Sequence, residues 1–159
     1  MSSLLIVTSV DRLQPQINAV VRALNNMPGA FISLNKTQRS TEQAISSAGV
    51  GTDKIFFIDC VTSEKTREDV LHLPPDALNM LAAAIGEFVQ DVKGQKYILV
   101  DSLPTLLIYN SSAKVAQFVK QLTDFASRPD VNLIAFSPKT KGEDLLNMVY
   151  NFFEKVEER

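Results

Sequence analysis

The sequence has one cysteine, one histidine and no tryptophan in 159 residues. A single cysteine, Cys60, forms no internal disulfide and no cysteine-based zinc site, and with His72 as the only histidine a histidine-rich metal site is excluded. No apolar run approaches the roughly 20 residues of a membrane-spanning helix. The N-terminus also lacks the basic segment and the long apolar stretch of a signal peptide. These absences predict a cytoplasmic protein without membrane insertion.

An excess of charge of one sign is also missing. Lysine and arginine number 16 against 18 aspartates and glutamates, which gives a formal net charge of −2. Without a basic run or excess, nucleic acid is not expected as a partner. The content of 45% hydrophobic and 21% charged residues is that of an ordinary globular protein. The length fits one domain over residues 1–159 with a full hydrophobic core.

Five short apolar segments alternate with helical patterns along the chain. The apolar segments are residues 4–8, 30–34, 54–59, 97–101 and 132–136. They are rich in Ile, Val, Leu and Phe without alternation, which is typical of strands buried on both faces. The helical patterns are residues 12–26, 40–48, a segment beginning near 74, 112–127 and 142–159. This order predicts a three-layer α/β fold with a mostly parallel sheet of five or slightly more strands, covered by helices on both faces.

Polar residues follow several of these strands, at the edge where parallel α/β sheets bind ligands. The candidate ligand-binding residues are Asp11, Arg12, Asn35, Asp59, Asp101 and Ser102. The two carboxylates at strand ends, Asp59 and Asp101, would suit Mg²⁺ if they came within a few ångströms of each other. Each carboxylate can instead bond nearby backbone, Asp101 at the turn 102–104. We favour that structural role and predict no metal.

The segment Tyr97-Ile-Leu-Val-Asp101-Ser102 has the Walker B pattern of a nucleoside triphosphatase. The loop after the first strand, Thr8-Ser-Val-Asp-Arg-Leu-Gln-Pro15, contains no glycine and no Gly-Lys-Ser/Thr. A phosphate-binding loop needs glycines to turn its N–H groups inward and a lysine for charge. The N-terminus of the first helix, with Arg12, could still attract an anion. The simpler interpretation is that Asp11 and Gln14 cap this helix.

Three segments resemble the RecA/KaiC-like family of P-loop ATPases, and more closely its degenerate relatives in prokaryotic signalling proteins. They are Gly29-Ala-Phe-Ile-Ser-Leu-Asn-Lys36, Gly51-Thr-Asp-Lys-Ile-Phe-Phe-Ile-Asp-Cys60 and Tyr97-Ile-Leu-Val-Asp-Ser-Leu103. The resemblance places Asn35 where the family has its catalytic glutamate, and an amide cannot act as a base. Asp101 matches the family residue that holds Mg²⁺ through water, and Ser102 matches the residue after it. We therefore expect no ATP hydrolysis, no catalytic residue and no cofactor.

The resemblance implies a non-catalytic regulatory or scaffold domain that contacts a protein partner or itself, in signal transduction or motility. A first alternative is a weak nucleotide or anion sensor at the edge around Asp101 and Asn35. A second is a receiver-like phosphoacceptor, with Asp59 as the phosphorylated residue, Ser102 as the sensing hydroxyl and Lys139 as the lysine that pairs with the phosphoryl group. A receiver also needs an acidic pair directly after its first strand to hold Mg²⁺, and Thr8-Ser-Val10 supplies none.

Partner surfaces are expected in three places. Residues 61–75 form the longest irregular piece and are predicted to be a flap or partner loop. The helices predicted over residues 112–127 and 142–159 are the two candidate partner faces, the second because of its crowded aromatics.

Cys60 is expected to be a small buried hydrophobe rather than a nucleophile. His72 is expected on the surface, so no catalytic triad is predicted.

Overall fold

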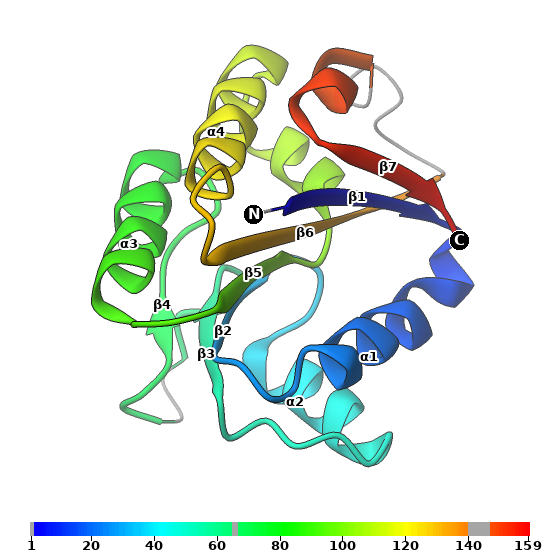
Figure 1. The fold of residues 1–159 in the computed structure, drawn as a ribbon, viewed down its shortest axis with the longest axis vertical. Helices are drawn as coiled ribbons and strands as arrows, with labels where there is room; N and C mark the ends of the chain where they lie inside the picture. Colours follow the sequence, from blue (N-terminus) through cyan, green and yellow to red (C-terminus); the bar gives the residue numbers. More distant parts are fainter. Residues whose placement is uncertain (1, 65–66, 140–146) are drawn as a thin grey trace.

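A single parallel sheet runs through the centre of the molecule (Figure 1). The computed structural model describes residues 2–64, 67–139 and 147–159. Within them the strands are β1 Ser2–Thr8, β2 Gly29–Ser33, β3 Ile55–Asp59, β4 Leu71–His72, β5 Lys96–Val100, β6 Val131–Pro138 and β7 Lys155–Glu158. Their order across the sheet is β4-β3-β2-β5-β6-β1-β7, and every neighbouring pair is parallel. The predicted α/β class is confirmed, and the sheet has seven strands where five or slightly more were predicted.

Helices cover both faces of this sheet, as predicted (Figure 1). The α-helices are α1 Leu13–Ala23, α2 Gln38–Ser47, α3 Leu78–Asp91 and α4 Ser112–Phe125, and the 3₁₀ helices are η1 Val10–Arg12, η2 Leu103–Ile108 and η3 Tyr150–Phe152. Helices α1 and α2 pack on one face, while α3, α4 and the segment around η3 pack on the other. None of the described helices is long and apolar enough to span a membrane.

Burial on both faces explains why the central strands lack an alternating pattern. Every residue of β2 and of β5 is buried. Side chains that point to one face enter the core under α3 and α4, as Ile32 and Val100 do. Their neighbours Phe31 and Leu99 enter the second core under α1 and α2. A strand between two such cores keeps apolar residues on both of its faces, and this makes it recognisable in the sequence.

The helix starts differ from the sequence predictions in detail. Helix α2 begins at Gln38, two residues before the predicted start, because the Thr37 side chain accepts the Ser40 N–H at 3.2 Å. Helix α1 is preceded by η1, and no side chain caps it. Asp11 lies within η1 and a hydrogen bond from Ser9 lowers its pKa. The prediction that Asp11 caps α1 is therefore wrong.

The predicted C-terminal helix is wrong over its last residues. Residues 140–146 lie outside the described part of the chain, and residues 147–149 are helical and lead into η3. The chain then extends as β7, whose Lys155 pairs with Leu4 of β1. The Arg159 N–H donates to the Val7 carbonyl at 2.9 Å. Pairing with β1 supplies hydrogen bonds to backbone groups that a sheet edge would leave open, and this outweighs the helical pattern.

Candidate functional site

Asp101 follows β5 directly and fastens the loop after β2. Its Oδ1 accepts the Leu34 N–H at 2.8 Å, and its Oδ2 accepts the Asn35 N–H at 3.3 Å. The side chain is buried, with 3% of its residue surface exposed. Burial raises the pKa of Asp101 to about 7, although the two N–H donors and the Lys36 charge act to lower it. Asp101 therefore has the structural role favoured from the sequence, with partners across the sheet instead of in the turn 102–104.

Asp59 plays a similar part at the end of β3. Its Oδ2 accepts the N–H of Gln38, the first residue of α2, at 2.8 Å. Its Oδ1 accepts the N–H groups of Val61 at 2.8 Å and Thr62 at 3.1 Å. A carboxylate at a helix N-terminus is favoured by the helix dipole as well as by these bonds. Asp59 thus fixes the start of α2 and the turn after β3 together.

The two carboxylates stand on either side of β2. Ser33 at the end of β2 pairs with Asp59, and the Asp101 N–H donates to the Ile32 carbonyl at 3.3 Å. Two strand spacings place their backbones roughly 10 Å apart. Among the described residues, no group of three His, Cys, Asp or Glu side chains converges as a metal site would require. The geometry thus gives no support to a magnesium site shared by Asp59 and Asp101.

A lysine that the sequence analysis did not single out bridges the loop after β2 to α1. The Lys36 ammonium donates to the Gln14 Oε1 at 3.2 Å, and its charge acts on Asp101. Arg12 and Asn35 are exposed. The only available signal was that Lys36 follows Asn35 in the chain, because its partner on α1 lies 22 residues away. Lys36 therefore brings a positive charge near Asp101 while it bonds to α1.

Ser102 is turned into the fold and does not face solvent. It is buried, and its Oγ accepts a hydrogen bond from the Thr105 hydroxyl at 2.8 Å within η2. Asp101 and Ser102 are therefore adjacent in the chain but bond different segments: Asp101 bonds the loop after β2, and Ser102 bonds η2. Asp11 and Arg12 lie in η1 on the surface, so the structure does not gather all six candidates into one enclosed site.

The strand order rules out the receiver-like hypothesis. A receiver has the order 2-1-3-4-5, in which the phosphoacceptor strand is next to the strand of the sensing hydroxyl. Here β2 lies between β3, which ends in Asp59, and β5, the strand that precedes Ser102. The Lys139 ammonium lies 3.8 Å from the Glu158 carboxylate instead. The receiver prediction is wrong.

His72 is half-buried and ordered, which corrects the prediction of a surface histidine in an irregular segment. It belongs to β4 and pairs with Asp59 in the sheet. Its Nδ1 lies 2.6 Å from the Thr62 carbonyl and 4.0 Å from Asp59 Oδ2. Since a carbonyl only accepts, Nδ1 carries the proton of this bond. His72 thus holds the turn after β3, and the segment 61–75 contains a short strand.

Cys60 is predicted to be unreactive in the folded protein. Burial, with the charges of Asp101 and Asp59, raises the pKa of its thiol to about 12. Because only the thiolate reacts, alkylation by iodoacetamide at pH 8 should be about a thousandfold slower in the native than in the urea-unfolded protein. Mass spectrometry after timed labelling measures this ratio. Equal rates in the two states would show that the thiol is exposed and that its pKa is not raised.

Comparison with known proteins identifies the fold. No family model and no curated protein matches the sequence. A KaiC-like protein from the hyperthermophilic archaeon Pyrococcus horikoshii OT3 matches 99% of this chain and 71% of its own, with TM-score 0.67 and 12% identity. An uncharacterized P. horikoshii protein, solved in complex with an unknown peptide, matches 99% of this chain and 76% of its own, with TM-score 0.77 and 13% identity. A third protein from P. horikoshii OT3 matches 99% and 81%, with TM-score 0.65 and 10% identity.

The fold is RecA/KaiC-like. At these identities the likeness concerns the fold alone, and it agrees with the resemblance seen in the three sequence segments. In this fold the carboxyl ends of β1, β2, β3 and β5 form the edge where the sequence placed the candidate residues. Asp59 and Asp101 lie at that edge, and both bond the chain's own backbone.

Proposed function

We propose that this chain is a non-catalytic regulatory or scaffold domain that acts through contacts with a protein partner or with itself. The observation that carries the proposal is the internal use of Asp59 and Asp101. Both oxygens of each carboxylate accept N–H groups of neighbouring loops. A residue that resembles a magnesium-holding aspartate is thus part of the framework of the sheet edge.

The surroundings of Asp101 support the absence of ATP hydrolysis. The exposed Asn35 cannot take a proton from water as a glutamate would. The loop after β1 has no glycine and turns through η1 straight into α1. Lys36, which could otherwise meet a phosphate, donates to Gln14. Among the residues that the structure describes around Asp101, neither an inward-facing N–H cradle nor an unbonded lysine is therefore present for a triphosphate.

Contact with a polypeptide has separate support. The P. horikoshii neighbour that was solved with an unknown peptide has the same fold. Since the three sequence segments resemble degenerate RecA/KaiC-like domains of prokaryotic signalling proteins, we place this domain in signal transduction or motility. This assignment follows the resemblance and not a feature of the site.

A second candidate function is a weak nucleotide or anion sensor. Arg12 is exposed at the start of α1, where the helix dipole favours anions, and Asn35 is exposed beside Asp101. Such a sensor would bind without hydrolysis, and Arg12 would carry most of its affinity.

Urea unfolding in the presence of nucleotide separates the two functions. A site of micromolar affinity would raise the free energy of unfolding by about 4 kcal/mol at millimolar ATP or ADP with Mg²⁺. We expect no increase and no phosphate release, for wild type and for Arg12→Ala alike. An increase in the free energy of unfolding that disappears in Arg12→Ala would favour the sensor function over the scaffold function. Phosphate release that is lost in Asp101→Asn would establish an ATPase.

A further inference from the structure

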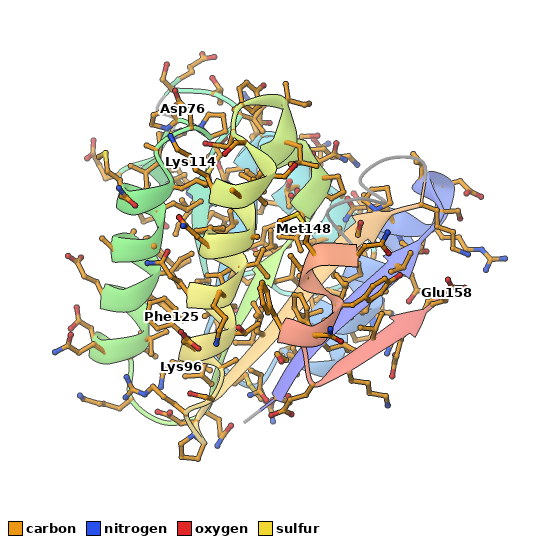
Figure 2. All side chains as sticks on the ribbon, turned by 90° about the horizontal axis from the view of Figure 1, so that it is seen from above. Asp76, Lys96, Lys114, Phe125, Met148 and Glu158 are labelled. Carbon is orange, nitrogen blue, oxygen red and sulfur yellow. The ribbon has the colours of Figure 1, made fainter. Side chains whose placement is uncertain are left out.

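The N-terminal halves of α3 and α4 leave an open groove between them. At the far end the two helices pack closely, since a Cβ on Gly86 of α3 would lie 3.3 Å from the Phe125 ring of α4. At the near end a hollow of about 630 Å³ separates them, with Asp76 and Lys114 among its lining residues. Figure 2 shows Asp76 and Lys114 at the same end of the helix pair and Phe125 towards the other end. We call this hollow the α3–α4 groove.

The lining of the α3–α4 groove is rich in side-chain amides. Asn79 comes from α3, Gln117 and Gln121 come from α4, and Asn110 comes from the loop between η2 and α4. The Asn110 amide donates to the Pro75 and Leu106 carbonyls, both at 3.0 Å, and so holds the groove wall in place. The other three amides, of Asn79, Gln117 and Gln121, are exposed. Within the described residues their side chains form no hydrogen bond. Three amides are thus free to bind a ligand.

The chemistry of these side chains fits a polypeptide main chain. Each amide offers both donors and an acceptor, which match the C=O and N–H groups of a peptide. Gln117 and Gln121 are four residues apart on α4, which is about 6 Å along the helix. Main-chain groups on one side of an extended peptide recur at about 6.7 Å. The two glutamines are therefore spaced to bond successive same-side groups of one extended segment.

The charged and apolar side chains of the groove indicate which kind of polypeptide segment would fit. Asp76 and Lys114 have opposite signs, so the groove favours a ligand that is neutral over the bound stretch. Met80 is 57% exposed at the rim and Phe118 is buried at the floor. Methionine adapts to varied side chains, and an apolar residue of the ligand could pack on it. We propose that the α3–α4 groove binds an extended, uncharged segment of a partner protein with an apolar side chain at Met80.

This inference rests on the proposed function and names the chemistry of the partner. The test uses a phage-displayed library of random peptides, selected on the full chain, followed by synthesis of the enriched peptides. Their dissociation constants are measured by fluorescence anisotropy for wild type and for the double variant Gln117→Ala/Gln121→Ala. Gln90→Ala is the matched control, because Gln90 is also exposed, on the last turns of α3 outside the groove.

We expect enriched peptides that bind wild type and Gln90→Ala equally, and bind the double variant about tenfold or more weakly. Failure to enrich any peptide overturns the proposal, and so does equal binding to the double variant. Light scattering tests whether a second copy of this chain occupies the groove instead. A dimer that the double variant abolishes would make that second copy the ligand and overturn the peptide assignment. Each of these results leaves the absence of nucleotide chemistry untouched, so the two proposals fail separately.

Discussion

Gly29→Ala should destabilise the protein by about 3 kcal/mol, at the upper end of the range for overpacked cores. Gly29 begins β2 and pairs with Tyr97 of β5. The Tyr97 ring covers it so closely that a Cβ would lie 2.0 Å from the ring carbon Cζ. Tyr97 is only 1% exposed, and burial raises its pKa to about 12. The ring therefore has no free space into which it can move.

Urea unfolding of Gly29→Ala against Gly51→Ala checks this expectation. A Cβ on Gly51 meets nothing closer than the Asp53 carboxylate at 3.4 Å, so that variant should stay within about 0.5 kcal/mol of wild type. In a Tyr97→Leu background the Gly29→Ala change should lose most of its effect, because the clashing ring is gone. A loss of similar size in both backgrounds would mean that the backbone of β2, and not the Tyr97 ring, requires glycine.

Asp101→Ala should destabilise the protein by about 3 kcal/mol, because it leaves the N–H groups of Leu34 and Asn35 without an acceptor. Leu34 is 5% exposed, so water replaces the lost bond poorly. Asp101→Asn retains one oxygen and should be less damaging. Asp91→Asn, at the exposed end of α3, is the control and should change the stability little.

The stability difference between wild type and Asp101→Asn should also depend on pH. Burial raises the pKa of Asp101 from 3.8 to about 7, so between these values the folded state holds a proton that the unfolded state has released. The stabilising effect of this proton is complete below about pH 4 and is lost as the pH rises through 7, at roughly 1.4 kcal/mol per pH unit. The free energy of unfolding of the wild type should therefore rise relative to that of Asp101→Asn as the pH falls from 7 to 5.

Urea unfolding of both proteins at pH 5, 6 and 7.5 measures this difference. Hydrogen bonds from Lys96 and Lys155 lower the pKa values of Asp130 and Glu157. Those groups lose their stabilising effect only as the pH falls through their lowered pKa values, and they do so equally in both proteins. Their contributions therefore cancel in the difference between the free energies of unfolding of wild type and Asp101→Asn. A difference that is the same at all three pH values would show that Asp101 is already ionised well below pH 7.

The central strands could be predicted because their whole length is buried. Strands β2 and β5 appear in the sequence as short apolar runs without alternation, which is typical of strands buried on both faces. Strands β4 and β7 have two and four residues and are partly exposed. Their existence depends on pairing with β3 and β1, far away in the chain. A local pattern carries no record of that pairing, so β7 was mistaken for the end of a helix.

The sequence allowed the two strand-end carboxylates to be named, but not the hydrogen bonds that they accept. Asp101 and Asp59 could be named because a carboxylate after a buried strand stands out in the sequence. Their acceptor roles depend on loops 67 and 21 residues away, and these separations are bridged only by the order of the strands. The α3–α4 groove was missed for the same reason, since its walls come from two helices that are separate in sequence. Only its α4 side had been predicted as a partner face.

The most direct test of the account is the response of two backbone amides to nucleotide. The N–H groups of Leu34 and Asn35 donate to Asp101, so their ¹H–¹⁵N signals report on this carboxylate. If Asp101 belongs to the framework, both signals stay unchanged as ATP and Mg²⁺ are titrated to millimolar concentration. Saturable shifts of both signals, absent with Mg²⁺ alone and lost in Arg12→Ala, would contradict the account and reveal a working nucleotide site.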